Sequence, residues 1–247
     1  MAPRARMVTD MATPIDATLG AAGLARLMAW LSPAFPVGGY SYSHGVERAI
    51  EEGVIRDGDT LRDWIEGALL YGPARVDADL LRETWRAVSG DDADAFAHAL
   101  MLGEVMRGTP ELALETRQQG ESFLTTVAAS WPHADMPHWI DRIRSESRAP
   151  AYPVSVGLAA ALHGIPRESV LPAFLQAFAA SLVSAAVRLV PLGQTVGQST
   201  LARLEPAIAE AAAASLTRSL DQLGSAAPMI DLLSIAHETQ HMRLFRS

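Results

Sequence analysis

The segment from Leu171 to Val190 restricts the fold of this chain more than any other stretch of its sequence. It is mostly apolar over about 20 residues, which is also the length of a membrane-spanning helix. Four polar side chains interrupt it: Gln176, Ser181, Ser184 and Arg188. Such groups are costly in lipid, whereas other helices can pair them inside a folded domain. We therefore expect a buried central helix and no membrane span.

Elsewhere, apolar residues repeat at the spacing of a helix. Two stripes are formed by Leu24, Leu27, Met28 and Leu31, and by Leu61, Trp64, Ile65, Ala68 and Leu69. Alternating runs typical of strands are essentially absent. The sequence predicts an all-α, single domain of about ten helices, bundle-like around the buried central helix.

Polar motifs indicate where helices begin, and composition indicates where the domain begins. The capping motifs are Thr60 with Asp63, Asp91 with Asp94, and Thr109-Pro110-Glu111. We expect residues 1–17 to be disordered, residues 18–236 to form the helical domain, and residues 237–247 to form a C-terminal tail that binds partners.

The segment 1–17 lacks the apolar core of a secretion signal, so a cytoplasmic protein is expected.

Charge and missing residue types exclude several classes of function. The formal net charge of −8, without a basic block, argues against nucleic-acid binding. The chain has no cysteine and no lysine, so thiolate metal sites and the lysine of a phosphate-binding loop are both excluded. No serine stands in a nucleophile elbow. We expect no catalytic residue, cofactor or metal, and a protein partner instead.

Two histidine groups nevertheless leave a metal site open. His237-Glu238-Thr239-Gln240-His241 matches H-E-x-x-H, in which two histidines on one helix bind zinc and the glutamate acts as general base. This alternative would make the chain a zinc metallohydrolase. Only six residues follow His241, so no third ligand lies downstream, and a solvated terminal helix or tail is favoured. The second group, His133, Asp135 and His138, is equally compatible with an ordinary helix connection.

Other titratable residues are expected at the surface. Isolated histidines, which are more often capping or surface residues than ligands, are His44, His98 and His163. Carboxylates at helix-surface spacing, expected to be solvated, are Glu47, Glu51, Glu52, Asp77 and Asp79.

The most unusual segment runs from Ser32 to Glu47 and combines two prolines, a glycine pair, two tyrosines and several serines. The prolines forbid a helix at its start and the glycines permit tight backbone, so an ordered loop that enters a helix is expected. Two interpretations stay open. The tyrosines can pack inside a connector, or they can form a recognition surface.

Four segments resemble the UreF family of urease accessory proteins. Residues 34–47 are similar to the family signature F-P-x-G-x-aromatic-S-x-S-x-G-L-E, with Val46 in place of leucine. Residues 151–157 and 187–198 look like two further family segments. Residues 237–246 resemble the family ending H-E-x-x-Y-S-R-L-F, with His241 and Met242 where tyrosine and serine are usual. The aromatic residue of relatives makes the H-E-x-x-H match a coincidence.

The resemblance implies a scaffold for nickel insertion into urease apoprotein. It implies binding of UreD (also called UreH), recruitment of the GTPase UreG, and a homodimer in the working complex, and it leaves open a role in modulating GTP hydrolysis. The residues assigned to partner binding are Tyr40, Ser41, Tyr42, His44, Glu47, Glu238, Arg243, Leu244 and Phe245. Among them, Tyr40 and Arg243 are assigned chiefly to the UreG contact. The tail is expected to be disordered until a partner orders it.

Overall fold

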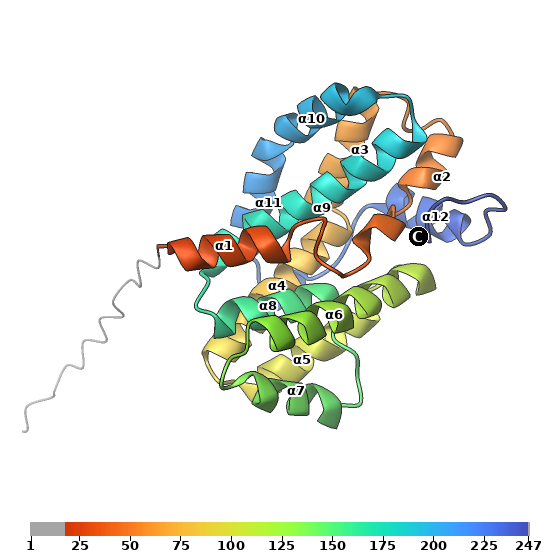
Figure 1. Cartoon of the computed structure of the whole chain (residues 1–247). Coiled ribbons are helices and arrows are strands. Elements are labelled where there is room, and N and C mark those ends of the chain that lie inside the picture. Colours follow the sequence, from red (N-terminus) through yellow and green to blue (C-terminus); the bar gives the residue numbers. More distant parts are fainter. Residues whose placement is uncertain (1–17, 247) are drawn as a thin grey trace, which may run out of the picture.

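The computed structural model describes residues 18–246, and these residues form helices without a single strand (Figure 1). The α-helices are α1 (Ala21–Trp30), α2 (Val46–Glu51), α3 (Gly58–Leu70), α4 (Pro73–Ser89), α5 (Ala93–Val105), α6 (Pro110–Ser130), α7 (Met136–Ser145), α8 (Tyr152–Leu162), α9 (Arg167–Leu189), α10 (Gly193–Arg203), α11 (Glu205–Thr217) and α12 (Pro228–His237). Two 3-10 helices are η1 (Gly39–Ser41) and η2 (Leu220–Gln222). The all-α single domain is thus confirmed, whereas the disorder predicted for residues 1–17 lies outside the described residues.

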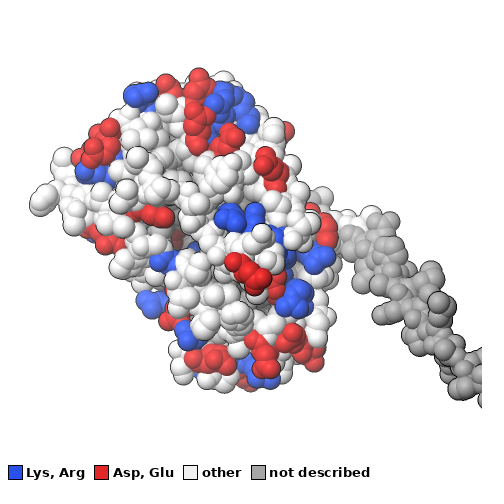
Figure 2. All heavy atoms as spheres, turned by 180° about the vertical axis from the view of Figure 1, so that it is seen from behind, with Lys and Arg blue, Asp and Glu red and all other residues white. Residues whose placement is uncertain are grey.

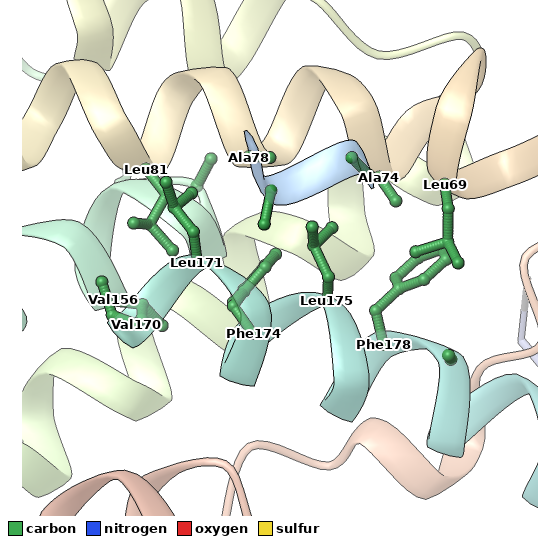
Figure 3. Packing of buried hydrophobic residues seen from close by; sticks show 14 of the residues in the cluster. Leu69, Ala74, Ala78, Leu81, Val156, Val170, Leu171, Phe174, Leu175 and Phe178 are labelled. Carbon is green, nitrogen blue, oxygen red and sulfur yellow. The ribbon is translucent and has the colours of Figure 1, made fainter. Parts of the chain in front are cut away.

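Helix α9 is the buried central helix that the sequence predicts. It packs against α2, α3, α4, α10 and α11. Within residues 18–246 it is the one helix long and apolar enough to cross a membrane, yet its neighbours cover Leu171, Leu175 and Leu182 completely. Figure 3 shows Leu171 and Phe174 pointing from α9 toward α4. The apolar run is therefore explained by burial inside the bundle.

Helix α4 joins the two halves of the bundle. On one side it packs against α5 and α8, and on the other against α3, α9 and α11 (Figure 1). The close approach of α8 depends on Gly157, where a Cβ atom would lie 2.6 Å from the carbonyl oxygen of Leu81. Likewise, a Cβ atom at Gly120 of α6 would collide with the carbonyl oxygen of Pro150, in the segment that leads into α8. Glycine thus allows α8 to approach α4, and the segment before α8 to approach α6.

One of the three predicted helix starts is confirmed. The Thr109 hydroxyl accepts a hydrogen bond from the backbone N–H of Leu112 at 3.2 Å. The capping box of α3 is formed by Asp57 and Thr60 and not by Thr60 and Asp63, so this helix begins three residues earlier. The cap of α5 is Asp92 and not Asp91. Neighbouring carboxylates and hydroxyls can all cap a helix, so the sequence alone does not identify which of them is the cap.

Of the two predicted apolar stripes, one is fully buried and the other only in part. Every member of the α3 stripe, from Leu61 to Leu69, is buried as expected. In α1, by contrast, Leu27 is buried but Leu24 is exposed and Met28 is 70% exposed. Helix α1 lies at the edge of the bundle, where no second neighbour covers the rest of its stripe (Figure 1).

Acidic and basic side chains are intermingled on the face opposite to that in Figure 1. Figure 2 shows them there in small mixed groups separated by uncharged surface. This distribution on the visible face agrees with the expectation that no basic block offsets the negative net charge.

Candidate functional site

The loop before α2 places its two tyrosines in different environments. Gly38 has φ of 74°, a left-handed conformation that starts the η1 turn. Tyr40 on this turn is 74% exposed. Tyr42 is buried, and its hydroxyl donates a hydrogen bond to Oε1 of Gln118 at 2.8 Å. Tyr42 is therefore packed inside the connector, whereas Tyr40 is free to contact a partner, and its role in recognition stays a prediction.

His44 fixes the end of this loop to the bundle. Its Nε2 atom lies 2.9 Å from Oε1 of Glu115 on α6, and its ring packs edge-on against Phe178 of α9, with 5.1 Å between centroids. Burial lowers the pKa of His44, but the charge and hydrogen bond of Glu115, together with Asp77, outweigh burial and raise it. His44 is not the isolated capping or surface residue that the sequence suggests.

Glu47, in the first turn of α2, is a buried acceptor for the tail. Its carboxylate accepts hydrogen bonds from the backbone N–H groups of Leu244 at 2.6 Å and Phe245 at 2.9 Å. Its Oε2 atom also lies 3.2 Å from Nε2 of His237. Three partners compensate for the burial of this carboxylate.

His237 does not belong to a zinc site. Helix α12 ends at His237, so His241 lies beyond the helix and the two imidazoles do not share a helical face. The side chain of His237 is 0% exposed, and its two ring nitrogens face Glu111 at 2.9 Å and Glu47 at 3.2 Å. The prediction of a solvated helix or tail is therefore wrong for His237. The same contacts leave no lone pair facing an open coordination position, which removes the basis for the metallohydrolase alternative.

The tail lies against the loop and is not the disordered segment expected. The backbone N–H of Arg246 donates to the carbonyl oxygen of Ser41 at 2.8 Å. Phe245 is only 3% exposed, and the guanidinium of Arg188 lies 4.4 Å from its ring centroid. Arg188 also donates from Nη1 to the carbonyl oxygen of Tyr40 at 3.0 Å. Arg188 thus connects α9, the loop and the tail.

The remaining assigned tail residues differ in exposure. Arg243 is partly exposed and pairs with Glu111, the second carboxylate that contacts His237. Leu244 is exposed although its backbone is bound to Glu47. Glu238 is half-buried at the end of α12, where its backbone N–H donates to the carbonyl oxygen of Ile235.

A cavity of about 220 Å3 lies beneath the loop, between α4, α6 and α9. Its wall combines aromatic side chains such as Phe174 with the charged groups of His44, Arg107 and Glu115. Arg107 Nη1 lies 2.6 Å from Oδ1 of Asp77. Opposite charges are thus paired along this wall, which allows the charged groups to be buried.

Three of the five carboxylates predicted to be solvated are in fact buried: Glu47, Asp77 and Asp79, whereas Glu51 and Glu52 are exposed as expected. Asp79 accepts from Nη1 of Arg218 at 2.9 Å, and Asp77 from Arg107. Helical spacing shows that residues share a face, but only the packing of other helices shows whether that face is covered.

Comparisons with known proteins identify the family of this chain. A sequence model of the UreF family matches residues 55–205. A urease accessory protein UreF of Granulibacter bethesdensis is 43% identical over 241 residues, covering 98% of this chain and 100% of that protein. Two more proteins of that name are 45% identical (Rhodopseudomonas palustris, covering 97% of both chains) and 47% identical (Azorhizobium caulinodans, covering 90% and 94%).

The chain belongs to the UreF family of urease accessory proteins. The loop and the tail lie on either side of residues 55–205, so the surface that they build falls outside the matched part of the UreF model. In this UreF family member, a residue before the matched region and residues after it contact one another, since Glu47 binds both His237 and Leu244.

The second histidine group of this UreF family member does not converge on one point. Nδ1 of His133 accepts a hydrogen bond from the backbone N–H of Asp135 at 3.2 Å, whereas the ring of His138 packs against Trp139. The described residues include no set of three histidine or carboxylate side chains placed to hold a metal ion. Nε2 of His163 donates a hydrogen bond to the Trp131 carbonyl oxygen at 3.1 Å. Burial, followed by the charges of Arg26 and His133, lowers the pKa of His163.

Sequence reasoning missed several residues that build the site. The sequence identifies Glu111 only as a first-turn acid of its helix, although in the structure it also pairs with His237 and Arg243. Glu115 carries no local signal, and Arg188 argues in the sequence only against a membrane span. A buried ion pair between distant positions has no local pattern, so only their convergence in space reveals these partners.

Proposed function

We propose that this chain is a non-catalytic scaffold in urease maturation. In this role it binds UreD (UreH), recruits the GTPase UreG to urease apoprotein for nickel insertion, and acts in the cytoplasm as a homodimer within the complex. The names of the relatives support the urease part of this proposal. A change in the partner's rate of GTP hydrolysis when this chain is added would establish the modulating role.

The observation that carries the proposal is that the tail packs against the loop while both segments keep exposed side chains. We call the side chains of Tyr40, Met242, Arg243 and Leu244 the composite surface. Tyr40 and Met242, with 74% and 88% exposure, are the most exposed large apolar residues in the described part of the chain. The hydrogen bond between Arg246 and Ser41 keeps the two segments together.

Helix α12 extends this apolar region. Met229, Leu232 and Ile235 are exposed at a spacing of three residues on the helix that leads into the tail. Scattered apolar residues are ordinary on a protein surface, whereas a continuous group beside polar residues is typical of an interface. The position of this group next to the composite surface supports a protein partner at this end of the molecule.

The chemistry of the two assigned anchors also suits protein recognition. Tyrosine presents a large ring at a low cost in side-chain entropy, and arginine can hold a carboxylate through two parallel hydrogen bonds. Arg243 is 40% exposed while paired with Glu111, so part of its guanidinium stays available to a partner.

Gel filtration of the chain with purified UreD-like and UreG-like proteins tests the proposal. The unmodified chain should form a complex with both partners, and Tyr40→Ala and Arg243→Ala should each reduce the amount of UreG-like protein that elutes with it. Two matched controls lie outside the composite surface. They are Tyr71→Ala, an exposed tyrosine, and Arg144→Ala, an exposed arginine paired with Asp141 on α7. Undiminished complex with both anchor variants would place partner recognition elsewhere.

A further inference from the structure

His237 lies where a doubly protonated imidazole can donate to two ionised carboxylates at once. Its Nδ1 and Nε2 atoms face carboxylate oxygens of Glu111 and Glu47, at 2.9 Å and 3.2 Å. An ionised carboxylate can only accept hydrogen bonds, and a neutral imidazole has a single N–H donor. With one proton fewer, His237 must therefore direct a lone pair at one of the two carboxylates.

The same two carboxylates hold the tail. Glu47 accepts the backbone N–H groups of Leu244 and Phe245, and Glu111 pairs with Arg243. The tail is thus attached to the domain through the groups that His237 bridges. Each carboxylate comes from a different helix, α2 or α6, so the bridge also joins these helices to the end of α12.

When both facing carboxylates are ionised, the charges around His237 are balanced only with a protonated imidazole. The groups that face it are Glu47 from α2, Glu111 from α6 and, through Glu111, Arg243 from the tail, with Glu238 following it in the chain. A protonated His237 and Arg243 compensate for both facing carboxylates. Loss of one proton leaves the Glu47 carboxylate, which is buried, without an opposite charge.

We propose that His237 is a positioning residue whose protonation controls whether the tail stays against the loop. In its charged form it holds Glu47 and Glu111 in place for the tail, and the composite surface is assembled. When it loses a proton, Glu47 turns away or takes up water, and Leu244 and Phe245 lose their acceptor. The consequence for partner binding rests on the proposed function, whereas the movement of the tail is a property of the chain alone.

A fluorophore on the tail of the isolated chain tests this proposal. Because the chain has no cysteine and Met242 is 88% exposed, Met242→Cys provides a unique attachment point on the tail. Fluorescence anisotropy of the label reports how firmly the tail is held. It should be high at about pH 6 and fall steadily toward about pH 9, the range in which histidine changes charge, while circular dichroism stays constant.

Three variants of the labelled chain separate His237 from other sources of a pH effect. His237→Gln, neutral at every pH, should give low anisotropy that does not change with pH. Glu47→Gln should also lose the pH response, because a neutral His237 can accept a hydrogen bond from the amide of Gln. Its anisotropy should be low, since the amide nitrogen cannot accept the backbone N–H of Phe245 as the carboxylate does. His241→Gln, an exposed histidine of the same tail, should behave like the unmodified chain.

The proposal is overturned if the pH response persists in His237→Gln or Glu47→Gln, if it disappears in His241→Gln, or if the label is mobile at every pH. Glu47→Gln covers the case in which His237→Gln does not fold. Since no partner is present, these outcomes do not depend on whether the composite surface recruits UreG. A pull-down with a UreG-like protein at the two ends of the pH range then measures the effect on recruitment separately.

Discussion

The side chains of Glu47 and His237 lie 3.2 Å apart although 190 positions separate them in the sequence. Both are buried, and both also bind groups of the C-terminal segment or of α6. This pair therefore closes the fold by joining the first third of the chain to its end. Burial makes the pair sensitive to the loss of either member, because the remaining group is left without its partner.

Truncation of either member should accordingly destabilise the domain. His237→Ala leaves two buried carboxylates without their common donor, and it should lower the free energy of unfolding by about 3–5 kcal/mol. Urea denaturation followed by circular dichroism measures this loss. Glu51→Ala, an exposed carboxylate on the same helix as Glu47, should change stability by less than about 0.5 kcal/mol. Equal effects of the two substitutions would contradict the buried pair.

The purified chain should hold no stoichiometric zinc after dialysis and should hydrolyse neither peptides nor GTP. Both ring nitrogens of His237 already face carboxylates, and His241 lies beyond the end of α12. Metal analysis and turnover assays measure this directly. Zinc that survives dialysis, or turnover that disappears in Glu238→Ala, would restore the metallohydrolase alternative.

Phe178→Ala should lower the free energy of unfolding by about 3–5 kcal/mol, because it removes a buried aromatic ring from α9 and leaves a cavity. Its ring also packs against His44, so the loop loses a contact as well. Thermal and urea denaturation provide the measurement. A loss below about 1 kcal/mol would mean that the surrounding helices collapse onto the site or that the ring is not buried.

The two tyrosines of the loop should respond in opposite ways to truncation. Tyr40→Ala removes an exposed ring, so it should leave the melting temperature unchanged and weaken binding of the UreG-like partner by about 2 kcal/mol or more if the ring is a central anchor. Tyr42→Ala removes a buried ring and its hydrogen bond to Gln118, so it should lower the melting temperature. Calorimetry and a binding titration distinguish them. A folding defect in Tyr40→Ala would assign this residue a structural role.

Stability should fall with rising pH because of His44. Its pKa in the folded chain is raised above 6.5, so the folded state binds a proton that the unfolded state releases. The contribution is fully present below pH 6.5 and is lost as the pH passes the raised pKa. Urea denaturation at several pH values should show this decline, and His44→Gln should reduce its slope. His138→Gln, an exposed histidine, should leave the slope unchanged.

The local elements of this fold could be read from the sequence because their signals are local. Helical spacing identified the buried stripe from Leu61 to Leu69, and the polar residues within α9 separated a core helix from a membrane span. Thr109 marked a helix start for the same reason, since a cap involves residues within one turn. Where several residues could cap or an edge helix had no second neighbour, as at Asp92 and Met28, local signals were not sufficient.

The sequence by itself determined that the chain is helical, that α9 is buried and that loop and tail resemble the UreF family at Tyr40 and Arg243. Only the tertiary structure decided that Glu47 is buried, that His237 bridges two carboxylates and that Phe245 packs under Arg188. The physical reason is the separation along the sequence of the residues that interact. Helix formation depends on neighbours a few positions away, whereas the burial and pairing of a charge depend on which distant segments happen to cover it.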